Sequence, residues 1–182
     1  MTRLRTVLVS LVLGAGLLIP AGPVAASSPE TSIMYVPVST RVLPDGTRVV
    51  LSKVWAANPA AAAGPAAITP LSAGQWHAGC QMTGYSSTNK IWTYTVWQDF
   101  WSSGSYITYF PLPAKEATSW LGWVLTSGPD PTHWWISYLY IGAARGNYTF
   151  TYYNLYGQPG SSSSGYVEIT VNYAGTWSCQ GA

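Results

Sequence analysis

Tyr148-Thr149-Phe150-Thr151-Tyr152 is the stretch that decides the fold class, because aromatic residues alternate in it with threonine at a period of two. Successive side chains of a β-strand point to opposite faces of a sheet, so this period predicts a strand with one buried face. The segment Tyr166-Val167-Glu168-Ile169-Thr170-Val171-Asn172 alternates polar and aliphatic residues in the same way. We therefore expect antiparallel strands in both segments, with Glu168 on a solvated face.

Further strands are predicted on both sides of these two segments. Aromatic and β-branched residues, which favour strands, are concentrated at 76–83, 91–101, 105–110, 120–126, 134–141 and 176–180. Stretches rich in glycine, proline or serine predict turns at 102–104, 128–131, 142–147 and 157–165. No segment has a convincing helical period. These features predict an all-β protein, an antiparallel β-sandwich or small barrel of about seven to nine strands.

The N-terminal residues 1–26 have the pattern of a secretory signal peptide. Arg3 and Arg5 precede an apolar run at 7–19, and small residues at 24–26 suit signal peptidase. The apolar run is shorter than the roughly 20 residues that a membrane span requires. We therefore expect a secreted, extracellular protein with no membrane anchor after cleavage.

Cys80 and Cys179 are the only cysteines in the 182 residues. An even number of cysteines in a chain sent to an oxidising compartment predicts a disulfide. Because the two cysteines stand near the ends of the aromatic-rich region, the bridge is expected to close one domain. A catalytic pair of Cys80 with His77 is not expected, because odd and even positions of a strand point to opposite faces.

The residues between the signal peptide and this domain divide into two parts. Residues 27–55 form an N-terminal segment with a possible β-hairpin, in which strand-like stretches at 33–39 and 48–55 flank the turn sequence Pro44-Asp45-Gly46-Thr47. Residues 56–72 are an Ala/Pro-rich linker without charge, and 73–182 are the aromatic-rich β-domain. The hairpin either docks on the domain, belongs to a pro-region or stays loosely ordered.

Charge and motif content exclude several classes of function. Without residues 1–26 the chain carries six basic and six acidic side chains, which argues against nucleic acid as a partner. No zinc or calcium motif and no nucleophile motif is present, so we expect no metal, no cofactor and no catalytic residue.

The high content of aromatic residues is the one feature of the sequence that points to a function. Residues 76–182 hold nine Trp, twelve Tyr and three Phe but only seven charged side chains. In strand 91–101 the residues Trp92, Tyr94, Val96 and Phe100 are predicted to face the core, which leaves Trp97, Asp99 and Trp101 on the other face. A hairpin to 105–110 would pair Trp101 with Tyr106, Asp99 with Thr108 and Trp97 with Phe110.

The predicted ligand-binding residues are therefore Trp97, Asp99, Trp101 and Tyr106, with the aromatic rings stacking on sugars and the carboxylate holding hydroxyl groups. The overall plan, a Trp-rich β-domain of low charge behind a Pro/Ala linker, resembles that of some secreted carbohydrate-binding modules. We expect a secreted, non-enzymatic domain that binds a polysaccharide or cell-wall glycan. The alternative is an extracellular envelope or protein-interaction domain with a protein partner, and a membrane-active β protein or a small hydrolase ranks lower.

Overall fold

The structure is a computed structural model that describes residues 33–56 and 74–182. The predicted signal peptide and residues 57–72 of the predicted linker lie outside the described residues. The described chain forms eleven strands: β1 Ile33–Val42, β2 Arg48–Ala56, β3 Gly74–Ser86, β4 Asn89–Ser102, β5 Ile107–Tyr109, β6 Ala114–Ser119, β7 Trp123–Ser127, β8 Thr132–Ser137, β9 Ile141–Tyr153, β10 Pro159–Asn172 and β11 Trp177–Gly181. The all-β class is confirmed, and nine of the eleven strands lie in residues 74–182, for which seven to nine were expected, while β1 and β2 form the N-terminal hairpin.

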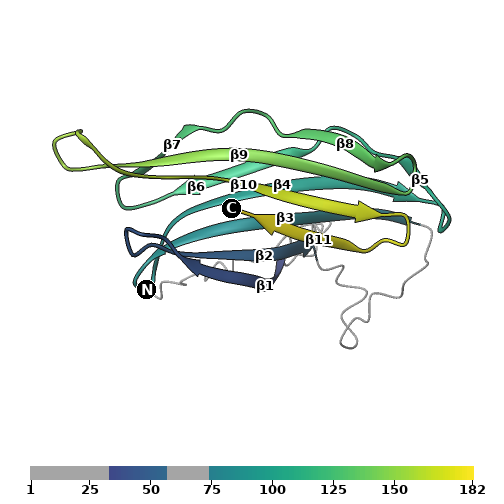
Figure 1. Ribbon diagram of the computed structural model, residues 1–182, viewed down its shortest axis with the longest axis horizontal. Coiled ribbons are helices and arrows are strands. Elements are labelled where there is room, and N and C mark those ends of the chain that lie inside the picture. Colours follow the sequence, from purple (N-terminus) through teal and green to yellow (C-terminus); the bar gives the residue numbers. More distant parts are fainter. Residues whose placement is uncertain (1–32, 57–73) are drawn as a thin grey trace, which may run out of the picture.

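The strands form two curled antiparallel sheets that run along the long axis of the molecule (Figure 1). The first sheet has the order β1-β2-β3-β4, with the short strands β5 and β6 both paired to β4. The second has the order β11-β10-β9, with β7 and β8 both paired to β9. Ala114–Ser119, which lies outside every strand predicted from the sequence, pairs with β4 as β6.

The core lies between the two sheets and is dominated by aromatic rings. Trp92, Tyr94 and Phe100 of β4 are fully buried, as the alternation of that strand predicted. Tyr148 and Phe150 of β9 face them from the second sheet, and the rings of Trp92 and Phe150 stack with their centroids 5.0 Å apart. The period of two therefore identified the buried faces of both central strands.

Two predicted turns are instead parts of long strands. Residues 142–147 lie in β9 and residues 159–165 lie in β10. A side chain would not fit at Gly142 or Gly146. A Cβ atom would lie 2.6 Å from the Phe110 ring at Gly142 and 2.6 Å from the Tyr94 hydroxyl at Gly146. These glycines permit close packing rather than a change of chain direction.

Serine residues of β10 pair with threonine residues of β9 through their hydroxyl groups. Ser164 lies 2.9 Å from Thr149 and Ser162 lies 3.2 Å from Thr151, measured between side-chain oxygens. Thr126 of β7 extends this ladder with a 3.0 Å contact to Thr151. The serine run, which lies in a stretch predicted to be a turn, is thus part of strand β10, where its hydroxyl groups pair across the strands in place of contacts with water.

The N-terminal hairpin docks on the domain, which was one of the three alternatives. Strand β2 pairs with β3 from Arg48 opposite Tyr85 to Trp55 opposite Ala78. Val49 and Leu51 of β2 are buried in the shared core. Hence β1 and β2 extend the first sheet, and β2 helps to enclose the core.

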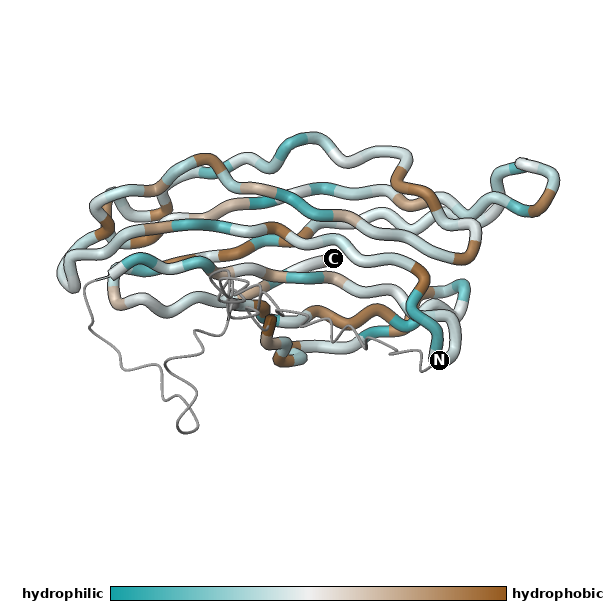
Figure 2. Tube along the Cα trace, turned by 180° about the vertical axis from the view of Figure 1, so that it is seen from behind, coloured by the Kyte–Doolittle hydropathy of each residue, from teal (hydrophilic) through white to brown (hydrophobic). Residues whose placement is uncertain are grey.

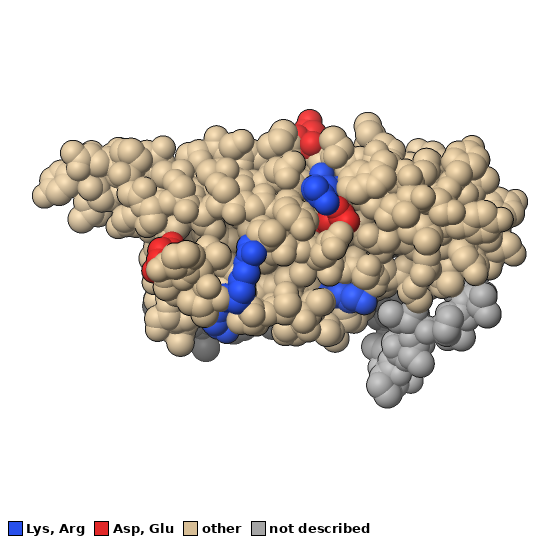
Figure 3. All heavy atoms as spheres, viewed as in Figure 1, with Lys and Arg blue, Asp and Glu red and all other residues tan. Residues whose placement is uncertain are grey.

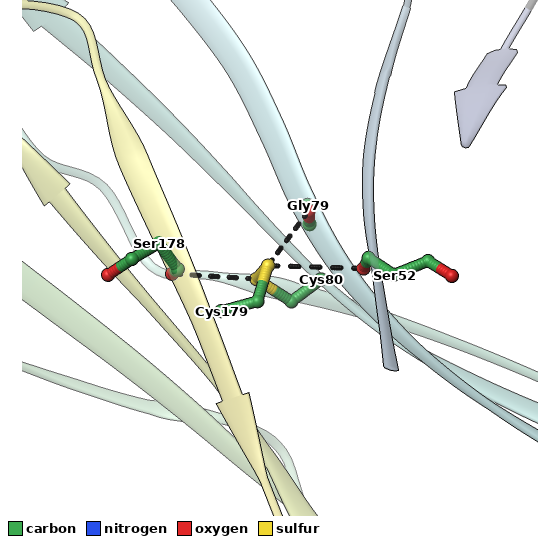
Figure 4. Close-up of a disulfide and its surroundings, with 5 residues drawn as sticks. All are labelled: Ser52, Gly79, Cys80, Ser178 and Cys179. Carbon is green, nitrogen blue, oxygen red and sulfur yellow. Dashed lines mark hydrogen bonds between the residues drawn. A yellow bond between two sulfur atoms is a disulfide. The ribbon is translucent and has the colours of Figure 1, made fainter. Parts of the chain in front are cut away.

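The predicted bridge between Cys80 and Cys179 is present. It joins β3 of the first sheet to β11 of the second, and it lies among the carbonyl oxygens of Ser52, Gly79 and Ser178 (Figure 4). The two cysteines are 99 residues apart in the sequence. The bridge therefore ties together two sheets whose strands are remote along the chain.

Two core tyrosines predict a loss of stability in alkali. Burial raises the pKa of Tyr94 to about 12, and the Asp130 carboxylate adds to this increase. Burial also raises the pKa of Tyr148 to about 12, against the opposing effect of Arg41. In the unfolded chain a tyrosine has a pKa of about 10, so the unfolded state releases these two protons first.

The stabilisation from the two neutral phenols is accordingly complete below about pH 10 and is lost as the pH rises toward 12. We expect the melting temperature to fall steeply across this interval in a series of calorimetric scans. The Tyr94→Phe/Tyr148→Phe variant should show a shallower fall, because it has no buried phenol to ionise. An equally steep fall in that variant would contradict this assignment.

Candidate functional site

Trp97 is buried, with 7% of its surface exposed, so the expectation of an exposed stacking ring is wrong at this position. Its indole lies against Gly79, where a Cβ atom would come within 2.6 Å of both the Trp97 ring and Val54. The imidazole of His77 stacks on the ring with a centroid distance of 4.6 Å. The absence of a side chain at Gly79, the cross-strand partner of Trp97, lets the indole pack onto the sheet.

Trp97 is therefore expected to contribute to stability. Trp97→Ala should lower the free energy of unfolding by about 3 kcal/mol, the low end of the range for a core tryptophan, because its neighbour His77 is about half exposed. Urea denaturation followed by fluorescence measures this change. The matched control is Trp101→Ala, which removes a partly exposed ring on the same face of β4 and should cost clearly less. Equal costs would show that Trp97 is no better packed than Trp101.

Asp99 lies directly opposite His77 on β3, and the two side chains form a contact that sequence reasoning missed. The His77 Nδ1 atom lies 2.5 Å from the Asp99 Oδ1 atom, and both side chains are close to half exposed. The two residues are 22 positions apart in the sequence. Their contact therefore follows only from the register in which β3 pairs with β4. Asp99 thus has a protein partner and still presents part of its carboxylate to solvent.

Trp101 has a different partner from the one expected. It lies opposite Tyr109, and the two rings meet edge to face with their centroids 4.9 Å apart. The predicted pairs of Trp101 with Tyr106, Asp99 with Thr108 and Trp97 with Phe110 are wrong; Trp97 lies opposite Ala114. The register shifts because an irregularity at the end of β4 sets Ser102 opposite Ile107, and the Ser103 amide donates to the Tyr106 carbonyl.

Four exposed tyrosines gather at the end of the molecule where β4 ends and β9 begins, and we name them the tyrosine end: Tyr106, Tyr109, Tyr138 and Tyr140, with 46 to 72% of their surface exposed. Backbone hydrogen bonds hold the segments that carry them together. The Ile107 amide donates to the Leu139 carbonyl at 2.6 Å, and the Tyr173 amide donates to the Tyr140 carbonyl at 3.0 Å. This end of the molecule is on the side of β5 in Figure 1.

Partly buried aromatic rings that pack against the core contact two of the exposed tyrosines. Trp135 lies 5.7 Å from Tyr138 and 5.0 Å from Phe110, measured between ring centroids. Tyr173 contacts Tyr140 edge to face at 5.8 Å. Sequence could not find this grouping, because 134–141 reads as one strand, whereas Leu139 has a φ of 63° and turns the chain between β8 and β9. The turn brings Tyr138 and Tyr140 to the surface.

Charged side chains on the described residues are few, and fewer than half of them form ion pairs. Lys115 and Asp130 lie 3.0 Å apart, and Arg145 and Glu168 lie 2.5 Å apart. Figure 3 shows one face of the molecule on which charged groups are sparse. Within the described ranges no group of three or more His, Cys, Asp or Glu residues could hold a metal ion.

Glu168 is buried, with 4% of its surface exposed, so its expected place on a solvated face is wrong. The Arg145 guanidinium covers it, and that guanidinium also lies 4.4 Å from the centroid of the Tyr166 ring. Gln180 of β11 donates to the other carboxylate oxygen. Both carboxylate oxygens accept hydrogen bonds, and Glu168 of β10 is thereby linked to β9 and β11.

Comparison with known proteins identifies no relative of this chain. No protein-family model, no curated protein and no solved structure matches the chain. Over residues 33–56 and 74–182 there is also no helix with the length and apolar character needed to cross a membrane.

Proposed function

We propose that this protein is a secreted, non-enzymatic domain that binds a polysaccharide or cell-wall glycan through the tyrosine end. The observation that supports this proposal is the gathering of four exposed tyrosines on segments linked by backbone hydrogen bonds. A sugar ring has one face of C–H groups and an edge of hydroxyl groups. A tyrosine ring can stack on that face, and its own hydroxyl can exchange hydrogen bonds with that edge.

The binding residues proposed from sequence change in part. Trp101 and Tyr106 stay in the proposed site, and Trp97 leaves it because its ring is buried. The other exposed tyrosines of the tyrosine end join it: Tyr109, Tyr138 and Tyr140. Asp99 stays as a polar residue beside Trp101 on the same face of β4. Preformed aromatic surfaces lose little conformational entropy on binding, so the backing by Trp135 and Tyr173 suits recognition.

Binding should weaken when the most exposed rings are removed. If each stacked ring contributes on the order of 1 kcal/mol, Tyr109→Ala and Tyr138→Ala should each weaken retention about five-fold, and the double variant about 30-fold. Pull-down on insoluble cellulose, chitin and peptidoglycan measures retention. The thermal stability of these variants should stay close to that of the wild type, because both rings are exposed.

The matched control is Tyr156→Ala, which removes a tyrosine that is more exposed than any of the four but lies at the opposite end of the molecule. This variant should bind as the wild type does. If none of the polysaccharides retains the wild type, or if the control and Tyr109→Ala/Tyr138→Ala are retained equally, the tyrosine end is not a glycan site.

Strand β1 supports the second candidate, an extracellular protein-interaction domain. Among the residues that the structure describes, β1 pairs only with β2, and all ten of its residues are exposed. Its exposed apolar side chains are Ile33, Met34, Tyr35, Val36, Val38 and Val42. An exposed edge strand can take up a strand of another protein. Under this alternative, Val36→Lys/Val38→Lys abolishes capture of a protein partner and leaves polysaccharide retention unchanged.

A further inference from the structure

The hairpin formed by β9 and β10 projects beyond the other strands at the end opposite the tyrosine end (Figure 1). Its tip is the pentapeptide Asn154-Leu155-Tyr156-Gly157-Gln158, which we name the hairpin tip. Leu155 and Tyr156 are 102% and 89% exposed, the highest values among the large apolar side chains of the described residues. In Figure 2 this projecting loop carries a hydrophobic segment, coloured brown.

The hairpin tip satisfies most of its own backbone hydrogen bonds. The Asn154 amide donates to the Gln158 carbonyl at 3.1 Å, and the Gly157 amide donates to the Asn154 carbonyl at 2.9 Å. The Asn154 side-chain oxygen accepts from the amides of Tyr156 and Gln158 at 2.9 and 3.0 Å. Four of the five backbone N–H groups are thereby paired inside the turn, so little hydrogen bonding to water is lost when the tip enters an apolar medium.

The parts of β9 and β10 that lie next to the hairpin tip carry no charge. Residues 146–167 contain no Asp, Glu, Lys or Arg. Arg145 and Glu168, the first charged residues on the two arms, lie opposite each other in the sheet and form an ion pair. Each lies about ten residues from the tip, which is roughly 30 Å along a strand. The threonine and serine hydroxyl groups between them pair across the strands.

We propose that the hairpin tip inserts Leu155 and Tyr156 into the interfacial layer of a lipid bilayer. The turn projects from the molecule, and most of its backbone amides are hydrogen-bonded within it. Its two apolar side chains can be buried in any apolar medium and do not require a pocket of matching shape. A lipid surface therefore fits these observations better than a protein partner does. Leucine suits the acyl boundary, and tyrosine suits the headgroup level, where its hydroxyl stays hydrated. The absence of charge on the hairpin implies binding to zwitterionic lipid with little dependence on salt.

Burial of one large apolar side chain corresponds to about a ten-fold gain in partitioning. Two side chains give weak, reversible binding, as is usual for a single shallow anchor. Leu155→Ser and Tyr156→Ser should therefore each reduce partitioning about ten-fold, and the double variant should leave no measurable binding. This inference does not depend on glycan binding, because the tyrosine end lies at the other end of the molecule.

Flotation of the full-length secreted protein with phosphatidylcholine vesicles tests the proposal, with phosphatidylserine-containing vesicles at low and high salt as a second arm. The matched control is Leu112→Ser/Val42→Ser, which removes two apolar side chains that are 79% and 68% exposed outside the hairpin. We expect the wild type and this control to float with both kinds of vesicle at either salt concentration. We expect Leu155→Ser/Tyr156→Ser to stay at the bottom of the gradient.

Three results would overturn the proposal. The wild type could fail to float with any vesicle, or the tip double variant could float as well as the wild type. Binding could also require phosphatidylserine and vanish in high salt, which would make it electrostatic. A dimer that the tip substitutions abolish, seen by light scattering together with no vesicle binding, would assign the hairpin tip to contact between two copies of the chain instead.

Discussion

Replacing Trp92 by alanine is expected to lower the free energy of unfolding by about 4 kcal/mol. Its ring is fully buried, stacks on Phe150 and contacts Tyr148 with a centroid distance of 5.2 Å. Removal of such a ring loses its transfer free energy and leaves a cavity between the two sheets. Urea denaturation measures the change. Trp120→Ala is the matched control, because that ring is 42% exposed, and its cost should stay below about 1 kcal/mol.

The same region offers a second test of the packing. The ring of Trp92 lies over Gly84 of β3, where a Cβ atom would come within 2.3 Å of the indole. Gly84→Ala should therefore also destabilise the protein, because the ring has to move out of a filled core. If Trp92→Ala cost no more than Trp120→Ala, and Gly84→Ala were neutral, the two sheets would not be packed through this ring.

Removal of the disulfide is the second change with a large expected effect. The bridge closes a loop of 99 residues, for which chain entropy predicts a contribution of roughly 4 to 5 kcal/mol. Cys80→Ala/Cys179→Ala should lower the free energy of unfolding by about 4 kcal/mol and the melting temperature by more than ten degrees, since about 1 kcal/mol corresponds to a few degrees in a domain of this size. Calorimetry of the double variant beside the wild type measures both.

The wild type treated with a reductant is the parallel sample and should melt close to the double variant. Two titratable thiols in the native protein, found before any reduction, would contradict the bridge itself. A double variant that melted with the wild type would show that β3 and β11 are held together by packing alone.

Sequence was sufficient for the faces of the central strands. Trp92, Tyr94 and Phe100 alternate with smaller or polar residues, and all three are buried. This success has a physical basis, because alternation reports which residues share a face. Alternation does not report whether the second face is also covered, so Trp97 was wrongly expected to be exposed.

The remaining errors concern contacts between residues that are distant in sequence. Glu168 is buried because Arg145, on the neighbouring strand, neutralises it, and neither residue alone indicates this. Gly142 and Gly146 serve close packing, which composition cannot distinguish from a turn. The partner of Trp101 depends on an irregularity between Trp101 and Ser102, and the observed register places Tyr109, three residues beyond the expected Tyr106, opposite Trp101. The tyrosine end could not be predicted for the same reason.

The pairing of β2 with β3 has a consequence for how the chain can be divided. Both strands are neighbours in one sheet, and the covalent connection between them runs through residues 57–73. A single cut anywhere between Ala56 and Gly74 would leave residues 33–56 attached to the rest by the strand ladder and by Val49 and Leu51 in the core. The protein is thus suited to fragment complementation, in which the β1–β2 peptide and residues 74–182, produced separately, reassemble into one folded unit.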